Sequence, residues 1–302
     1  MSTTRRRHGW LVTGSGGMLG QDLIARLRTE DEPVTAFDRS SLDITDSLTV
    51  HSVLAALRPA IVVNAAAWTS VDAAEAHEEQ ALAVNGDGAG VLARACRDIG
   101  AVLLHVSSDY VFSGDACTPY AEDTPVAPRS AYGRTKAAGE RAVLSELPDT
   151  GYVVRTGWLY GTGGGNFVRT MIDLEAVRDL VDVVNDQRGQ PTWTVDLADR
   201  LVRLGAAAKA RTAPSGVYHG TSSGETTWYG LAREVFALLG ADPERVRPTT
   251  SEAFRRPAHR PAYSVLGHER WRTAGVPSIR HWRTALAEAF PALRQSHVPE
   301  QS

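Results

Sequence analysis

The chain has 302 residues, enough for one large α/β domain or for two lobes that share a cleft. Its 43% hydrophobic and 22% charged residues are ordinary for a globular protein, and a net charge of −3 argues against general binding to nucleic acids or membrane surfaces. No apolar run reaches the roughly 18 residues that span a bilayer, and Arg5–Arg7 lacks the apolar stretch of a signal peptide. With Cys96 and Cys117 as its only cysteines, we expect a cytoplasmic protein without a disulfide framework.

The first two-thirds of the sequence alternates short apolar runs with longer amphipathic stretches, which is typical of βα units around a parallel sheet. The apolar runs are rich in Val and Ile without polar alternation, so they predict strands buried on both faces. Strands are expected at Trp10–Thr13, Val34–Phe37, Ile61–Asn64, Val102–Ser107 and Tyr152–Arg155. Helices are expected near Leu19–Thr29, Leu48–Leu57, Ala81–Ile99 and Ala131–Leu147.

Beyond Thr156 the alternation is less regular. Helices are expected at Asn166–Leu174, Val195–Ala208 and Trp228–Leu239, and strands at Leu180–Val184 and Gly216–His219. The remainder is rich in proline and arginine, most of all between Arg245 and Arg272.

A glycine-rich turn joins the first expected strand to the first expected helix. Gly14, Gly17 and Gly20 form the pattern G-x-x-G-x-x-G, with Met18 and Leu19 before the last glycine. Such a turn lets the backbone approach a pyrophosphate, and the helix N-terminus supplies N–H donors and the positive end of its dipole. Because the motif stands between a strand and a helix, we expect NAD(P) to bind here.

The end of the second expected strand bears on the choice of cofactor. Asp38 favours NADH because a carboxylate binds the hydroxyls of the adenosine ribose, whereas Arg39 favours NADPH because a guanidinium neutralises the 2′-phosphate. The two signals oppose each other and leave the preference open. Asp43 and Ile44, further along the loop, either flank the adenine or form a structural turn.

These features predict an α/β protein: a doubly wound parallel (Rossmann) sheet with a smaller, interleaved C-terminal substrate-binding lobe. We expect residues 1–157 to form the NAD(P)-binding domain, with 195–220 returning to it. Residues 158–194 and 221–302 are expected to form the lobe.

Tyr132 and Lys136 form a Y-x-x-x-K pair on one face of an expected helix. A phenol with a pKa near 10 exchanges protons poorly at neutral pH, and an adjacent ammonium is expected to lower that pKa. Ser108, at the carboxyl end of the fourth strand, could hydrogen-bond a substrate carbonyl. The pattern occurs by chance in many helices, but here it follows the other motifs in order. Its lysine is also one of only two among 32 basic residues, the other being Lys209.

In this order the motifs resemble the extended short-chain dehydrogenases/reductases, and more narrowly the dTDP-4-dehydrorhamnose reductases and related deoxysugar 4-ketoreductases. The resemblance covers about Trp10 to Leu266. Its narrower marks are the stretches Asn64–Glu75, Ser107–Phe112, Arg155–Gly161, Asn166-Phe167, Asp186–Thr192, Gly216–His219 and Arg260–Ser264.

The resemblance implies a reductase that delivers hydride from NADPH or NADH to the C4 ketone of a dTDP-linked 4-keto-6-deoxyhexose. Ser108, Tyr132 and Lys136 match the catalytic triad of the family, with serine at 108 in place of the more usual threonine. The family pattern places Asn64, Ala65 and Ala66 against the nicotinamide half of the cofactor.

The resemblance also implies a substrate site in which Tyr110 and Trp158 line the sugar pocket and Asn166 and Arg260 help to hold the diphosphate. Structural alternatives stay open. Trp158 could belong to the core, Tyr110 could pack under a lid, and Arg260 could belong to a solubilising surface segment. The histidines of the apolar strands, His105 and His219, are expected in the core rather than as ligands.

The sequence departs from the family pattern in two places. Some members bind Mg²⁺ between subunits through glutamates, where this chain carries Asp22 and Val195. We therefore expect no metal site and a monomer or weak homodimer. Tyr263 stands where the family often has asparagine, which bears on substrate detail.

Two other functions compete with a reductase. One is a nucleotide-sugar 4,6-dehydratase or 4-epimerase of the same superfamily, and the other is a non-catalytic NADP-binding regulatory subunit. Dehydratases typically carry Thr-Asp-Glu after the fourth strand, whereas this chain has Ser108-Asp109-Tyr110, which argues against dehydration. An intact Ser-Tyr-Lys set argues against a purely regulatory role.

Overall fold

The computed structural model describes residues 9–295, so Arg5–Arg7 lies outside the described residues. A six-stranded parallel sheet runs through its centre in the order β10-β5-β4-β3-β1-β2. Its strands are β1 (Trp10–Thr13), β2 (Val34–Phe37), β3 (Ile61–Asn64), β4 (Val102–Ser108), β5 (Gly151–Thr156) and β10 (Gly216–His219). The doubly wound parallel sheet predicted from the sequence is confirmed.

The strand order places a crevice at one edge of the sheet. β1 lies between β2 and β3, so the connection after β1 runs to β2 on one side, whereas the connection after β3 runs to β4 on the other. Ligands of open α/β sheets bind where the connections diverge in this way, beyond the carboxyl ends of the strands. β2 is one of the two edge strands and is half exposed, so the expectation that it is buried on both faces was wrong.

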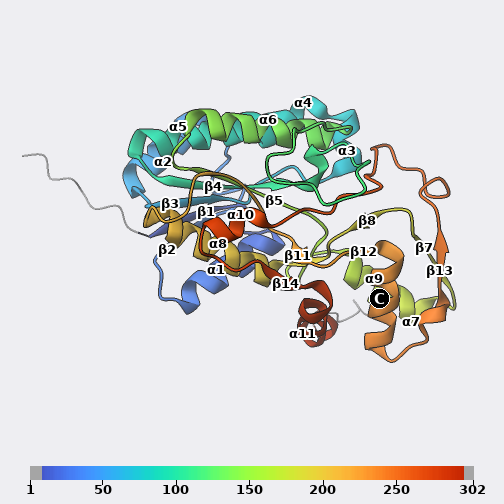
Figure 1. Ribbon diagram of the computed structural model, residues 1–302. Coiled ribbons are helices and arrows are strands. Elements are labelled where there is room, and N and C mark those ends of the chain that lie inside the picture. The colour runs from blue at the N-terminus through green and yellow to red at the C-terminus, as the bar shows by residue number, and fades with distance from the viewer. Residues whose placement is uncertain (1–8, 296–302) are drawn as a thin grey trace, which may run out of the picture.

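Helices cover both faces of the sheet (Figure 1). One face carries α1 (Met18–Thr29) and α8 (Thr194–Lys209), which pack on each other. The other carries α2 (Ser47–Leu57), α5 (Ala89–Ile99) and α6 (Ala131–Glu146). Each face has its own apolar core, and Cys96 lies buried in the second core, whereas Cys117 is exposed; both are free thiols.

The helix expected over Ala81–Ile99 is composite. It consists of α4 (Glu78–Leu82), a π-helical segment (Ala83–Gly88) and α5, and α3 (Val71–Ala76) precedes it. The wider π turn carries Asn85, whose side chain accepts from Trp68 N at 2.8 Å and donates to Thr135 Oγ1 at 3.0 Å. The irregularity therefore ties the segment after β3 to α6.

A smaller lobe lies beside the carboxyl ends of the strands (Figure 1). Its core joins apolar side chains of α7 (Phe167–Val177), α9 (Trp228–Leu239) and α11 (Trp282–Gln295). Its small sheets pair β6 (Leu159–Tyr160) with β9 (Thr192–Trp193), β7 (Val181–Val184) with β13 (Val246–Thr249), β8 (Arg188–Gly189) with β12 (Thr226–Thr227), and β11 (Ser222–Ser223) with β14 (Ile279–His281).

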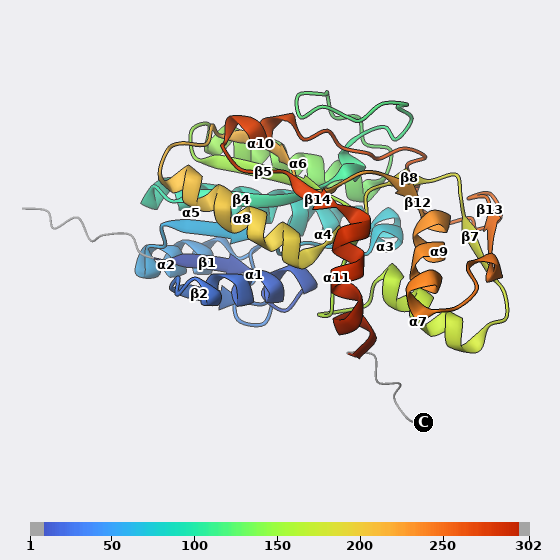
Figure 2. The same ribbon diagram turned by 60° about the horizontal axis from the view of Figure 1, so that its bottom comes forward.

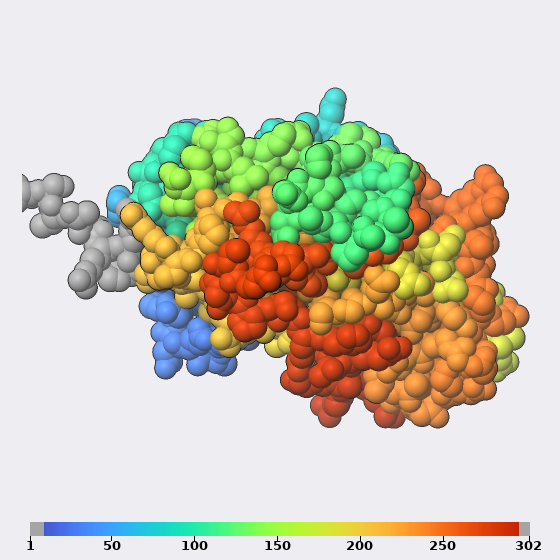
Figure 3. Space-filling model, viewed as in Figure 1, coloured from blue at the N-terminus to red at the C-terminus, as the bar shows by residue number. Residues whose placement is uncertain are grey.

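The lobe and the sheet are interleaved along the chain. β10 returns to the sheet and α8 covers it, and a second return brings α10 (Glu269–Thr273) against β10, with Trp271 and Ile279 in the sheet core. Figure 3 shows this red segment against the body of the molecule, with the orange lobe to its right. Part of 221–302, the stretch expected to belong to the lobe, therefore packs with the sheet.

The last helix, α11, was not predicted from the sequence. Its buried residues Trp282, Leu286, Ala289, Phe290 and Leu293 recur at helical spacing, but Pro291 interrupts the pattern. In Figure 2 α11 lies between the lobe and the helices beneath the sheet. Within residues 9–295 the longest apolar helices still fall short of what a bilayer span requires.

Candidate active site

Two adjoining hollows form one cleft beyond the carboxyl ends of β1, β3, β4 and β5. Their volumes are about 410 and 580 Å³, and both are lined by Gly14, Gly17, Ala65, Ala67 and Thr69. The smaller hollow extends to Asp38 and Ile44, and the larger extends to Tyr132 and Trp158. The cleft therefore brings the expected dinucleotide residues and the expected catalytic residues into one space.

The glycine turn fits a bound pyrophosphate. Gly14 has a φ of +75°, and a Cβ on it would lie 2.5 Å from the Ala66 nitrogen; a Cβ on Gly20 would lie 2.2 Å from the Gly14 oxygen. Gly17 is the N-cap of α1, and no side chain caps this helix and no acid lies in its first turn. The backbone N–H groups at the start of α1, from Met18 to Gly20, thus face a space suited to an anion.

At the nucleotide end of the cleft, Asp38 is held as a carboxylate. Its Oδ1 accepts hydrogen bonds from the backbone and hydroxyl of both Ser40 and Ser41, at 2.7–3.0 Å, and the Ser40 hydroxyl above all lowers the pKa of Asp38 to about 2. Arg39 lines the same hollow and is exposed. Both opposing signals for the cofactor are therefore present at the site.

The loop after β2 closes the same end. Asp43 Oδ1 accepts from the backbone and hydroxyl of Thr45, which lower the pKa of Asp43, so this carboxylate also organises its own loop. Ile44 is buried and lines the hollow with Asp43.

Asn64 lies beneath the cleft rather than on its surface. It is 1% exposed; its Oδ1 accepts from Thr13 Oγ1 at 2.8 Å and from Ala66 N at 3.1 Å, and its Nδ2 meets His105 Nδ1 at 3.0 Å. Asn64 therefore shapes the Ala65–Ala66 turn, and those alanines line the cleft. Ala66 lines the hollow that contains Asp38, which places it nearer the adenosine end than the resemblance implies.

Tyr132 and Lys136 project from the first two turns of α6 into the larger hollow. The helix begins at Ala131 because the Ser130 side chain caps it, accepting from Gly133 N at 3.1 Å. Lys136 is only 2% exposed, and its Nζ donates to the Val106 carbonyl at 2.7 Å. Burial lowers the pKa of Lys136 to about 8, against the opposing effect of Glu140.

Burial, not the lysine, dominates the pKa of Tyr132. Burial raises it to about 12, and a hydrogen bond with Ser108 acts in the opposite direction. Lys136 lies one helical turn away, and its ammonium is directed to the Val106 carbonyl of β4. A phenol that stays protonated at neutral pH suits a proton donor, which is what ketone reduction requires.

The substrate end of the cleft is aromatic. Tyr110 and Tyr132 meet edge to face with ring centroids 5.6 Å apart, and Trp158 stacks on Trp228 with centroids 3.5 Å apart and planes 4° apart. Trp158 has a φ of +51°, a costly conformation for a non-glycine residue. Trp228 begins α9 of the lobe, and its Nε1 donates to Gln187 Oε1 at 3.1 Å. The stack therefore joins the lobe to the end of β5.

Tyr110 and Trp158 thus line the cleft rather than lying only in the core. Sequence reasoning missed Trp228, Gln187 and Ser264, which line it as well. Gln187 and Ser264 lay within the stretches that marked the resemblance, whereas Trp228 offered only a helix start as a signal.

A family model for the RmlD substrate binding domain matches residues 9–295. The chain belongs to this family. A relative from Streptomyces griseus, named dTDP-4-dehydrorhamnose reductase, is 62% identical over 287 residues, 95% of this chain and 94% of the relative. One from Streptomyces niveus, named dTDP-4-keto-6-deoxy-D-glucose reductase, is 57% identical over 284 residues, 94% of this chain and 97% of the relative.

Solved structures agree with the family. The crystal structure of dTDP-4-dehydrorhamnose reductase from Bacillus anthracis, in complex with NADP, has a TM-score of 0.89 to this chain at 36% identity. The match covers 95% of this chain and 100% of that one.

The two residues expected at the diphosphate, Asn166 and Arg260, differ in whether they have unengaged hydrogen-bond donors. Asn166 caps α7 through Oδ1, and its Nδ2 donates to the Gly161 and Gly164 carbonyls at 2.8 and 3.1 Å, so contact with a diphosphate would break one of these bonds. Arg260 donates from Nη2 to Asp72 Oδ2 at 2.8 Å, while its buried Nη1 has no hydrogen-bond partner within residues 9–295. Arg260 is therefore anchored but keeps donors for an anion.

The structure also shows the surroundings of the residues that depart from the family pattern, Asp22, Val195 and Tyr263. Asp22 accepts a hydrogen bond from Thr194, the residue before Val195, and burial raises its pKa. Within residues 9–295, no three His, Cys, Asp or Glu side chains gather in a group that could hold a metal. Tyr263 hydrogen-bonds Glu225 at 3.2 Å.

His105 and His219 are buried, and burial lowers the pKa of both, so they are core residues.

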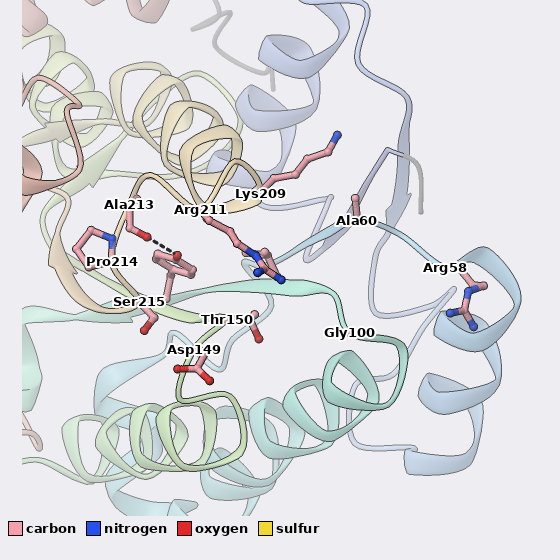
Figure 4. Close-up of a pocket in the computed structure, with 13 residues that line it drawn as sticks. Arg58, Ala60, Gly100, Asp149, Thr150, Lys209, Arg211, Ala213, Pro214 and Ser215 are labelled. Carbon is pink, nitrogen blue, oxygen red and sulfur yellow. Dashed lines mark hydrogen bonds between the residues drawn. The ribbon is translucent and has the colours of Figure 1, made fainter. Parts of the chain in front are cut away.

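A further hollow of about 740 Å³ lies at the opposite, amino-terminal ends of the strands and carries Arg58, Lys209 and Arg211 (Figure 4). Helices α2, α5 and α8 end there, and cations complement the negative ends of helix dipoles. In Figure 4 the side chains of Arg58 and Lys209 lie far apart. These cations therefore have a structural explanation and do not outline a ligand site.

Proposed function

We propose that the protein reduces the C4 ketone of a dTDP-linked 4-keto-6-deoxyhexose with NADPH or NADH, as a deoxysugar biosynthetic enzyme. The observation that carries this proposal is the single cleft in which the glycine turn and α1 meet Ser108, Tyr132 and Lys136. The names of the two Streptomyces relatives differ in the sugar but share a dTDP-linked 4-keto-6-deoxyhexose as substrate.

Each residue has a role that its surroundings support. The bound nicotinamide cofactor supplies the hydride. Tyr132, whose pKa is raised to about 12, holds the proton that neutralises the alkoxide. Lys136 fixes its ammonium on the Val106 carbonyl, one helical turn from Tyr132, where it holds the nicotinamide ribose. Ser108 orients the carbonyl, and Tyr110 and Trp158 flank the sugar.

We also propose that different segments of the chain bind the cofactor and the sugar nucleotide. Residues 1–157 with 195–220 bind the cofactor, and 158–194 with much of 221–302 bind the sugar nucleotide. We propose a monomer or weak homodimer in the cytoplasm. The free thiols of Cys96 and Cys117 suit a reducing compartment, and Asp22 is engaged within its own chain.

The test is a screen of dTDP-4-keto-6-deoxyhexoses with NADPH and NADH, in which the configuration of the product at C4 is read by NMR. Stoichiometric oxidation of the cofactor is expected for each molecule of sugar reduced. An epimerase would recycle its cofactor, and a regulatory subunit would bind it without turnover. Either result would reject the proposal.

Cofactor preference should respond oppositely to changes at Asp38 and Arg39. Arg39→Ala should raise the KM for NADPH by roughly fivefold with little effect on NADH, the size typical of one exposed charge pair. Asp38→Asn should favour NADPH because it removes a carboxylate whose pKa is about 2. Steady-state kinetics with both cofactors measure this, and equal effects on the two would remove Arg39 from the ribose site.

Arg260→Ala should raise the KM for the dTDP-sugar and leave cofactor binding unchanged. A lost charge-assisted hydrogen bond predicts a fall in kcat/KM on the order of 10–150-fold. Arg272→Ala is the matched control, because Arg272 is 83% exposed and pairs with its own helix neighbour Glu269. Equal, negligible effects at both positions would assign Arg260 to surface charge.

A further inference from the structure

Asp109 is a buried acid beside the proposed catalytic residues. It follows Ser108 at the end of β4 and is 3% exposed. Its carboxylate accepts a hydrogen bond from Ser108 Oγ at 2.9 Å, and a hydrogen bond from Ser264 acts to lower its pKa. Burial raises the pKa of Asp109 to about 6, so both of its protonation states occur near neutral pH.

The hydrogen bonds around Ser108 leave it no proton for a substrate while Asp109 is ionised. A hydroxyl has one proton to donate and two lone pairs to accept with. Ser108 Oγ donates to Asp109 Oδ1 at 2.9 Å and accepts from Tyr110 N at 3.2 Å. The single proton of Ser108 is therefore engaged by the Asp109 carboxylate.

Protonation of Asp109 reverses the direction of its hydrogen bond with Ser108. The carboxylic acid donates to Ser108 instead of accepting from it, so Ser108 accepts from Asp109 and from Tyr110 N. Its own proton is then directed to Tyr132 and the ketone oxygen, the orientation that stabilises negative charge on either atom.

We propose that Asp109 is a positioning residue whose protonation state sets the direction of the Ser108 hydroxyl, with the protonated form active in reduction. This inference rests on the proposed function, because it assigns Asp109 to the same reaction. Asp109 acts through its hydrogen bond with Ser108.

The groups that face Asp109 do not titrate in the same pH range, so its ionisation can be distinguished from theirs. Tyr132 from α6 and Tyr110 from its own turn face it, and burial raises the pKa of both, so they stay neutral over the relevant range. Ser264 from the C-terminal segment and the backbone of Gly157 after β5 bring no charge. Lys136 titrates higher, at about 8.

Ser264 provides a directional control. Its hydrogen bond stabilises the carboxylate and lowers the pKa of Asp109, so Ser264→Ala should raise that pKa. If Asp109 had a purely structural role, the pH profile of activity would not follow this shift in its pKa.

The experiment measures kcat/KM for the dTDP-4-keto-6-deoxyhexose with NADPH from about pH 5 to about pH 8. In the wild type, kcat/KM should fall at least about tenfold as pH rises through the pKa of Asp109, near 6. Ser264→Ala should move this fall to higher pH. Asp109→Asn should abolish it, because a carboxamide N–H donates to Ser108 at every pH.

A second measurement needs no turnover. The ¹³C NMR titration of the Asp109 carboxyl in the substrate-free protein, identified by its loss in Asp109→Asn, should show a pKa near 6 that rises in Ser264→Ala. If the wild type reduces no keto-sugar, the proposed function fails while this titration still reports on Asp109. A wild-type profile without the fall, a fall that persists in Asp109→Asn, or an unshifted Ser264→Ala would overturn the inference.

Discussion

Tyr132→Phe should lower kcat by roughly 10²–10⁴-fold, the usual contribution of a positioned general acid. Burial raises the pKa of this phenol to about 12, so it holds its proton at neutral pH beside Ser108. Phenylalanine keeps the ring that meets Tyr110 edge to face and removes only the hydroxyl. The loss should therefore appear in the chemical step.

Single-turnover kinetics and cofactor fluorescence separate this loss from a binding defect. NADPH should bind Tyr132→Phe nearly as tightly as the wild type, since the glycine turn and α1 are untouched. Near-wild-type turnover would remove Tyr132 from the reaction. Weak cofactor binding would instead assign the tyrosine a role in the nucleotide site.

Lys136→Arg should also lower activity severely although it keeps the charge. Lys136 is 2% exposed, and its ammonium reaches a single carbonyl, that of Val106. The broad planar guanidinium does not fit where a compact ammonium is enclosed, so it would displace neighbouring groups of the cleft. A displacement of about 1 Å at a reacting centre can cost on the order of 10²-fold in rate.

The chain offers a matched control in its other lysine. Lys209 ends α8, is exposed and lies at the opposite edge of the sheet. Lys209→Arg should leave kcat and KM unchanged, and the melting temperatures of both variants show whether the fold is intact. Full activity in Lys136→Arg would show that the reaction does not require a lysine at position 136.

Local sequence patterns were sufficient for the frame of the site. The six strands of the sheet, the G-x-x-G-x-x-G turn and the Y-x-x-x-K pair depend on residues close together in the chain, where strand and helix periodicity set the geometry. The expected strands at Trp10–Thr13, Ile61–Asn64 and Gly216–His219 have the bounds that the structure shows. Cleft-facing positions of Ser108, Tyr132 and Lys136 follow from that frame.

The hydrogen-bond partner of each polar atom in the site depends on how distant segments pack together. Asn64 was expected on the cofactor, but contacts with Thr13 and His105 engage it beneath the cleft. Lys136 was expected to tune Tyr132, and the structure shows in addition that the Val106 carbonyl of β4 holds its ammonium.

Trp228 and Ser264 reach the cleft from segments far along the chain, through the return of the lobe to the sheet. Such partners are set by packing between distant segments, and no periodicity in the sequence carries that information. The same is true of Asp109. Its sequence neighbours identify it as an acid after a strand, but only burial beside Ser108, Ser264 and Tyr132 brings its pKa near neutrality.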